Sequence, residues 1–326
     1  MKPFELLQVA TVGEAVAGTG PGNKYIAGGT NLVDLMKYEV EHPDRLIDIT
    51  RLPLRDVTDL HGGLRIGALV PNSDLAENAL VKRRYPVLSE ALLNGASPQL
   101  RNMATVGGNL LQRTRCYYFM DAAFPCNKRQ PGSGCPAIAG INRIHAILGQ
   151  SENCIATHPS DMAVALAALD TVVNVTGPEG DRQIPIAEFH RLPGDQPEID
   201  TTLKLGELIT SIEIAPLAMA QHSRYLKVRD RAQYAFALVS VAAMLDIRGG
   251  TVRGARIALG GVAHKPWRAH EAETALMGKP ATATSFRGAA EAALMSAKGY
   301  KHNEFKIELA KRAIVRTLTM VAGGAA

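Results

Sequence analysis

All four cysteines of the chain fall in one stretch, and their spacing limits what that stretch can become. Nine, eight and eighteen residues separate Cys116, Cys126, Cys135 and Cys154. A structural zinc site usually pairs its ligands roughly two to four residues apart, because a short loop can aim two thiolates at one ion. An iron–sulfur cluster needs only four thiolates on loops that can wrap around it. The spacing therefore favours an iron–sulfur cluster over zinc, with a disulfide or inert buried thiols third.

Four basic residues accompany these cysteines in the sequence: Arg113, Arg115, Lys128 and Arg129. A cluster held by four thiolates carries net negative charge, so a nearby cation would raise its reduction potential. Solubility of an exposed loop explains each of these residues equally well, and the sequence alone does not choose between the two.

The composition describes a folded protein and argues against several kinds of partner. A chain of 326 residues is long for one core, so two domains are expected. The basic residues are dispersed, and their densest run, 82–84, is best interpreted as a solvated face. With 5% aromatic residues and no alternation of rings with cations, we expect no nucleic-acid partner.

The sequence shows no targeting signal of its own. No run approaches the roughly 18 apolar residues of a membrane span, so no span is expected. The N-terminus has neither the apolar stretch of a signal peptide nor a twin arginine. We therefore expect a cytoplasmic protein, or one that reaches the periplasm folded, by export with a partner that bears a twin-arginine signal.

Two glycine pairs, each followed closely by an asparagine, mark turns that could face an anion. Gly28 and Gly29 come directly after a strand-like run and before a helical one, and Gly107 and Gly108 precede Asn109. A strand, a glycine turn and a helix in this order point backbone N–H groups at a ligand such as phosphate. A plain tight turn is the commoner use of one glycine pair, but the repetition favours a ligand.

The remaining pattern predicts two α and β regions. Residues 11 and 14 have capping-box spacing, and residues 24–49 form a β-α-β unit. A second unit contains strands at 64–70 and 207–214, a hairpin over 171–185, and helices at 74–80, 87–93 and 162–169. Asp161 either caps the last of these helices or binds a ligand. After a linker at 216–221, strands at 224–228, 236–247 and 252–259 precede three helices, at 268–277, 284–297 and 305–321, which suggests a separate α+β domain.

Taken together, these residues resemble the FAD-binding, or medium, subunit of the xanthine dehydrogenase family of molybdenum hydroxylases. The likeness spans essentially the whole chain and includes residues 25–31, 105–109, 160–161 and 227–243. Residues 110–116, 125–129 and 132–135 resemble the branch of periplasmic aldehyde oxidoreductases whose FAD-binding subunit carries an additional [4Fe–4S] cluster. Members without that cluster lack these cysteines.

The resemblance implies an α+β fold with two domains. Residues 1–221 would form a FAD-binding domain of the vanillyl-alcohol oxidase (PCMH) type, with subdomains at about 1–56 and 57–221 and a cysteine-rich insert at 112–157. Residues 222–326 would form a domain like the C-terminal domain of the carbon monoxide dehydrogenase flavoprotein, a three-stranded sheet with helices.

The resemblance also implies the residues that hold each cofactor. The first pyrophosphate loop would be Ile26, Ala27, Gly28, Gly29, Thr30, Asn31, Leu32, Val33 and Asp34, and the second Thr105, Gly108, Asn109 and Leu111. Asp161 would bind near the ribose, and Ala96, Ile209 and Lys227 would approach the flavin ring. The alternative for Lys227 is a surface ion pair with Asp230 or another neighbouring carboxylate. Cys116, Cys126, Cys135 and Cys154 would ligate the [4Fe–4S] cluster.

The function implied is electron transfer within a heterotrimer. A molybdopterin-binding large subunit would hydroxylate an aldehyde or aromatic substrate, a [2Fe–2S] small subunit would relay electrons, and FAD on this chain would pass them to an external acceptor. No side chain of this chain is expected to be catalytic. A stand-alone FAD-dependent reductase of the same fold and a zinc-stapled binding module are the alternatives.

Overall fold

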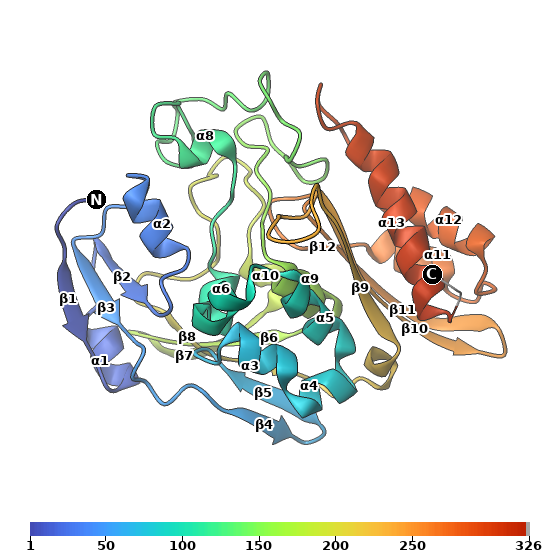
Figure 1. Ribbon diagram of the computed structural model, residues 1–326, viewed down its shortest axis with the longest axis horizontal. Helices are drawn as coiled ribbons and strands as arrows, with labels where there is room; N and C mark the ends of the chain where they lie inside the picture. The colour runs from blue at the N-terminus through green and yellow to red at the C-terminus, as the bar shows by residue number, and fades with distance from the viewer. Residues whose placement is uncertain (324–326) are drawn as a thin grey trace.

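The computed structural model describes residues 1–323 and begins with a small parallel sheet (Figure 1). Its strands β1 (Glu5–Gln8), β2 (Asn23–Ile26) and β3 (Arg45–Asp48) lie in the order β1-β3-β2. Helix α1 (Val12–Ala17) begins with the expected capping box, and α2 (Leu32–Lys37) connects β2 to β3. The β-α-β prediction is confirmed. Strand β1 was not predicted, because all four of its residues are exposed and show no alternation.

A five-stranded antiparallel sheet forms the middle of the chain. Its order is β4 (Val57–Leu60), β5 (Gly63–Gly67), β8 (Leu208–Ile214), β6 (Val172–Gly177) and β7 (Gly180–Pro185). The predicted hairpin over 171–185 is confirmed as the pair β6 and β7. Helices pack over this sheet: α3 (Asn72–Glu77), α4 (Ala79–Arg84), α5 (Pro86–Asn94) and α9 (Asp161–Ala168). The shorter helices of this region are α6 (Pro98–Met103), α7 (Val106–Leu110), α10 (Ile186–Phe189) and the 3-10 turn η1 (Ala218–Gln221).

The C-terminal part contains a four-stranded antiparallel sheet, not the three strands expected. Its order is β12 (Trp267–Arg268), β11 (Thr251–Gly260), β10 (Val239–Arg248) and β9 (Ser223–Val228). The fourth strand has two residues, too few for any pattern to reveal. Three helices follow, as predicted: α11 (His270–Leu276), α12 (Ala283–Ala293) and α13 (Phe305–Val321).

This sheet is buried on both faces, so the C-terminal part shares a core with the rest of the chain. Side chains alternate along a strand. Val241 and Ala243 of β10 pack in the cluster that contains α11 to α13, whereas Ala242 and Met244 pack in the cluster that contains α5 and α9. The N-terminal part therefore covers one face of this sheet, and the division into two domains stays a prediction.

The cysteine insert, residues 112–157, is almost entirely loop, with one short helix, α8 (Tyr117–Met120). In Figure 1 it is the green loop region around α8 at the top of the view. Its far end is tied to the C-terminal part through Lys306, whose buried Nζ donates to the carbonyl groups of His145 and Gly261, at 2.7 and 2.5 Å. Among residues 1–323, no helix is long and apolar enough to cross a membrane.

Candidate functional site

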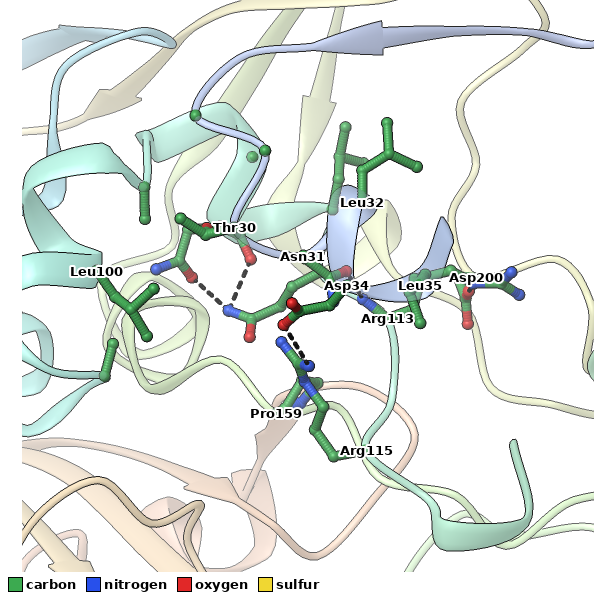
Figure 2. A pocket seen from close by; sticks show the side chains of 18 of the residues that line it. Thr30, Asn31, Leu32, Asp34, Leu35, Leu100, Arg113, Arg115, Pro159 and Asp200 are labelled. Atoms are coloured by element: carbon green, nitrogen blue, oxygen red, sulfur yellow. Dashed lines mark hydrogen bonds and ion pairs between the residues drawn. The ribbon is translucent and has the colours of Figure 1, made fainter. Parts of the chain in front are cut away.

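A cavity of about 1360 Å³ lies where the small parallel sheet, the middle region and the C-terminal part meet. Figure 2 shows part of its wall, where residues of α2 face Arg113, Arg115 and Pro159. Fifteen of the seventeen residues expected to bind FAD line this cavity: Ile26, Ala27, Gly28, Gly29, Thr30, Asn31, Leu32, Asp34, Ala96, Thr105, Gly108, Asn109, Leu111, Asp161 and Lys227.

The two exceptions are Val33 and Ile209, which do not line the cavity. Val33 packs back onto its own turn, where its Cγ2 would lie 3.0 Å from a Cβ at Gly29. Ile209 is 2% exposed and lies on β8 behind Gly107, 3.7 Å from where a Cβ on that glycine would be. It therefore supports the second turn from behind.

The first glycine turn presents unpaired backbone N–H groups to the cavity. Within residues 1–323, no protein group accepts a hydrogen bond from the N–H of Gly28, Gly29, Thr30 or Asn31. Gly28 is required by close packing, since a Cβ there would lie 1.8 Å from the carbonyl oxygen of Met103. Gly29 has φ +71°, which favours glycine. Successive free N–H groups in a concave turn suit an anion.

The second glycine turn differs, because most of its N–H groups are already used. Gly107 donates to the carbonyl of Ala68 at 2.8 Å, and Gly108 donates to Oγ1 of Thr105, the N-cap of α7, at 3.4 Å. The sequence-based expectation that both turns offer free N–H groups therefore holds for the first turn only. The second turn contributes shape and the side chains of Thr105 and Asn109.

Asn31 and Arg115 add polar groups that the glycine pattern does not reveal. The Oδ1 of Asn31 accepts from the N–H of Arg113 at 2.9 Å, which leaves its buried Nδ2 without a partner among the described residues. Nη1 of Arg115 lies 3.9 Å from Oδ2 of Asp34, and Figure 2 draws this ion pair. The guanidinium carbon of Arg115 lies 5.1 Å from the centre of the Phe236 ring. Arg115 was expected beside the cysteines, but it lines the large cavity instead.

Asp161 and Lys227 form a buried ion pair at the cavity wall. Lys227 Nζ donates to Oδ2 of Asp161 at 2.8 Å, and Tyr225 donates its hydroxyl to Oδ1 at 2.6 Å. Burial raises the pKa of Asp161, and Lys227 opposes that shift. Ser160 caps α9 through Ala163 N–H, so the cap role considered for Asp161 is wrong.

The pair also decides the alternative considered for Lys227. Its side chain is 1% exposed, and Asp230 pairs with Arg143 instead. The proposed surface ion pair with Asp230 is therefore wrong. Nearby, Ala96 faces the cavity with φ +48°, a conformation that L-residues other than asparagine and aspartate rarely adopt. Such strain persists where the surrounding structure imposes it, often at binding sites.

The four cysteines line a second, much smaller cavity within the insert. All four are free thiols, so the disulfide alternative is wrong. Burial raises the pKa of Cys116 to about 12 and that of Cys154 to about 11, while backbone N–H groups that face the sulfurs oppose the shift. Nε2 of His145 lies 3.0 Å from Sγ of Cys116. Buried thiols aimed at one space need a positive centre to become thiolates.

Comparison with known proteins identifies the family. Residues 2–217 match the FAD binding domain in molybdopterin dehydrogenase, and residues 224–321 match the CO dehydrogenase flavoprotein C-terminal domain. The chain belongs to the FAD-binding subunits of the molybdenum hydroxylase family. It is thus a subunit of an oxidoreductase, with the α+β fold expected of that family.

Individual members of the family agree with this assignment. The chain is 53% identical to the aldehyde oxidoreductase FAD-binding subunit PaoB of Escherichia coli, over 98% of both chains. It is 30% identical to the glyceraldehyde dehydrogenase medium chain of Sulfolobus acidocaldarius, over 78% of this chain and 73% of the other. A carbon monoxide dehydrogenase structure from Hydrogenophaga pseudoflava superposes over 100% of both chains, with a TM-score of 0.77 and 28% identity.

Proposed function

We propose that this chain is the FAD- and [4Fe–4S]-carrying electron-transfer subunit of a heterotrimeric molybdenum hydroxylase that oxidises aldehydes. The observation that carries the proposal is the pair of neighbouring cavities, one with free N–H groups for a pyrophosphate and one lined by four thiols. The 53% identity to a subunit of an aldehyde oxidoreductase supports the substrate class.

The large cavity fits FAD by its chemistry. The N–H groups of Gly28 to Asn31 would hold the pyrophosphate, with the unpaired Nδ2 of Asn31 and the Arg115 guanidinium as further donors. Lys227 of β9 and Ala96, which follows α5, line the same cavity. Bound FAD would supply the redox chemistry, and this chain would bind it and exclude water from it.

The small cavity is proposed to hold a cluster because of its thiol donors. Within residues 1–323, no three Cys, His, Asp or Glu side chains converge closely enough to hold one metal ion. Zinc needs its sulfur ligands about 2.3 Å from a single centre, whereas a cluster of several irons is wider and holds its thiolates further apart. Four free thiols that line one cavity are the donor set of a [4Fe–4S] cluster, and this chemistry supports the proposal.

The proposed partners follow from the family. A molybdopterin-binding large subunit and a [2Fe–2S] small subunit would deliver electrons, and an external acceptor would remove them. The names of the relatives, medium chain and FAD-binding subunit, describe parts of larger enzymes and support this arrangement. We further propose that the complex reaches the periplasm by co-export with a partner that bears a twin-arginine signal, which cell fractionation would test.

Analysis of the purified chain tests the cofactors. The chain should carry about one FAD, with about four irons and four sulfides per chain, and no zinc. Zinc without flavin would overturn the proposal. Serine replacement of Cys126 and alanine replacement of Gly28 provide matched variants, because each is expected to remove one cofactor and spare the other.

Co-expression with the proposed large and small subunits tests the assembly. The proposal expects a stable complex that contains molybdenum and oxidises aldehydes, and little aldehyde oxidation by this chain alone. If the isolated chain were monomeric and reduced a substrate with NADPH at full rate, it would be the stand-alone reductase instead.

A further inference from the structure

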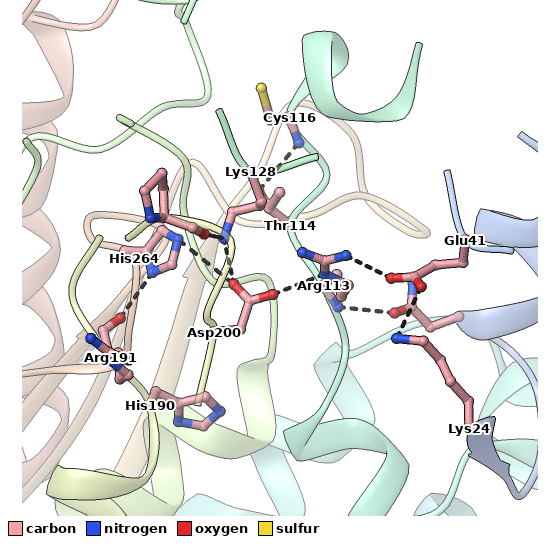
Figure 3. A network of polar contacts seen from close by, with 12 residues as sticks. Lys24, Glu41, Arg113, Thr114, Cys116, Lys128, His190, Arg191, Asp200 and His264 are labelled. Carbon is pink, nitrogen blue, oxygen red and sulfur yellow. Dashed lines mark hydrogen bonds and ion pairs between the residues drawn. The ribbon is translucent and has the colours of Figure 1, made fainter. Parts of the chain in front are cut away.

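The carboxylate of Asp200 stands between the two cavities. Oδ1 of Asp200 accepts a hydrogen bond from Nζ of Lys128, and Oδ2 accepts one from Nε of Arg113 at 2.9 Å (Figure 3). Lys128 lines the cysteine cavity, whereas Arg113 and Asp200 line the large cavity. Arg113 continues to Glu41 at 2.6 Å, and Glu41 to Lys24 at 2.9 Å. Charges of alternating sign therefore run from one cavity to the other.

Lys128 is the member of this series that lines the cysteine cavity. Its side chain is 1% exposed, and its Nζ donates to Asp200 and to the carbonyl of Pro197. Lys128 and Cys154 line the same cavity, and the positive charge of Lys128 acts on Cys154. Of the four cations that accompany the cysteines in the sequence, Arg113 and Arg115 face the large cavity and Arg129 donates to the carbonyl groups of residues 118, 119 and 124. Lys128 alone of these four lines the cysteine cavity.

The carboxylate of Asp200 is ionised, and its neighbours keep it so. Although burial opposes it, Lys128 and Arg113 hold the pKa of Asp200 well below its usual range. His264 lies 3.7 Å from Oδ1 of Asp200, but burial lowers its pKa to about 4, so it is neutral near pH 7. The Lys128 ammonium is therefore the positive group of this cavity, and Asp200 offsets part of its field.

We propose that Lys128 sets the reduction potential of the cluster in the cysteine cavity, and that Asp200 is a positioning residue that fixes Lys128 and tempers its effect. The inference rests on the proposed cluster. A reduced cluster carries one more negative charge than an oxidised one, so a buried cation favours reduction. Charges act strongly in a poorly polarisable interior and are little screened by salt there.

The test compares two neutralising variants of opposite sign in the assembled complex. Lys128→Met removes the cation and lowers the cluster potential, whereas Asp200→Asn removes the anion and raises it. We expect each variant to change the one-electron equilibrium by about tenfold, which corresponds to about 59 mV.

Electron paramagnetic resonance during a redox titration measures these shifts, and the signal that disappears in Cys126→Ser identifies the cluster. Lys82→Met, which removes an exposed cation paired with Glu77, is the control and should leave the potential unchanged. Both shifts should persist at high ionic strength. If Lys128 and Asp200 had only a structural role, both variants would shift the reduction potential in the same direction, or would lose iron without a shift in the potential.

The outcomes separate this inference from the proposed function. Absence of iron and sulfide from the wild-type complex would overturn the proposed cluster. Iron in the wild type with an unchanged or lowered potential in Asp200→Asn would overturn the role of Lys128 and Asp200 alone. If Lys128→Met loses its iron, the direction in which Asp200→Asn shifts the reduction potential decides whether the proposed role of Lys128 and Asp200 stands.

Discussion

The two cavities of this chain are built by opposite means. The large cavity offers the backbone N–H groups of the first glycine turn, and the side chains at that turn are mostly small. The cysteine cavity offers side-chain thiols on a segment that is almost all loop. A backbone site depends on how closely the chain can approach itself, so glycines matter most there. A thiol site depends on each ligand, and its loops are held in place by what they bind.

The largest expected effect is the loss of a thiol. Cys126→Ser should remove essentially all of the cluster iron and destabilise the insert by several kcal/mol, roughly, because metal-binding energy is folding energy in such a segment. Flavin content should stay at the wild-type level, because the first glycine turn lines the large cavity, whereas Cys126 lines the cysteine cavity. Iron and flavin analysis measures both, with Ile141→Val, an exposed change in the insert, as the control. Full iron in Cys126→Ser would refute the ligand assignment.

Breaking the buried ion pair should come next. Lys227→Met leaves Asp161 buried without its cation, which should cost about 3–5 kcal/mol. The large cavity would then prove to depend on one side-chain pair as well as on its backbone. Urea unfolding of the flavin-loaded chain measures the loss, and Lys82→Met at an exposed pair should change stability by less than about 1 kcal/mol. Equal effects in the two variants would contradict the importance of burial.

Glycine replacement tests the backbone site directly. A Cβ at residue 28 would overlap the carbonyl of Met103, so Gly28→Ala should displace the turn, cost about 1–3 kcal/mol and abolish flavin binding. Cluster iron should be retained. Gly13→Ala is the matched control, because a Cβ there meets nothing within 4 Å and alanine favours the helix. Retention of flavin in Gly28→Ala would show that the first turn does not hold it.

The glycine turns and the regular strands could be read from the sequence because their signals are local. Periodicity and turn residues predicted the β-α-β unit, the hairpin β6–β7 and the helices α11 to α13. The predicted FAD residues came from a family likeness, and all but Val33 and Ile209 line one cavity. Their contacts with FAD stay predictions.

The pairings between distant segments could not be predicted. Asp161 and Lys227 are 66 residues apart, and Lys128 and Asp200 are 72 apart, so no local pattern joins them. Arg113 and Lys128 are basic residues of the same insert, yet they face different cavities. Long-range packing decides such contacts, and the sequence gives only the residues that are available for them.

The smallest effect expected of any one residue lies between the two cavities, where three buried histidines lie near Asp200. Burial lowers the pKa of His190 and of His264 to about 4, and that of His158 well below its usual range. The unfolded chain, with values near 6.5, therefore binds more protons than the folded chain between about pH 6.5 and 4. Stability is full above this window and falls as the pH falls through it, by roughly 1–2 kcal/mol per histidine between pH 7 and 5.

Urea unfolding at a series of pH values measures this slope and separates it from the contribution of Asp200. Because the pKa of that carboxyl is depressed, its stabilisation is present above about pH 4 and is lost only below that value. His264→Gln removes one titrating ring and should reduce the slope between pH 6.5 and 4.5 by about one proton. Asp200→Asn should instead flatten the curve below about pH 4. If both variants changed the pH dependence of stability over the same pH range, the histidines and the carboxylate would titrate as one coupled group between the two cavities.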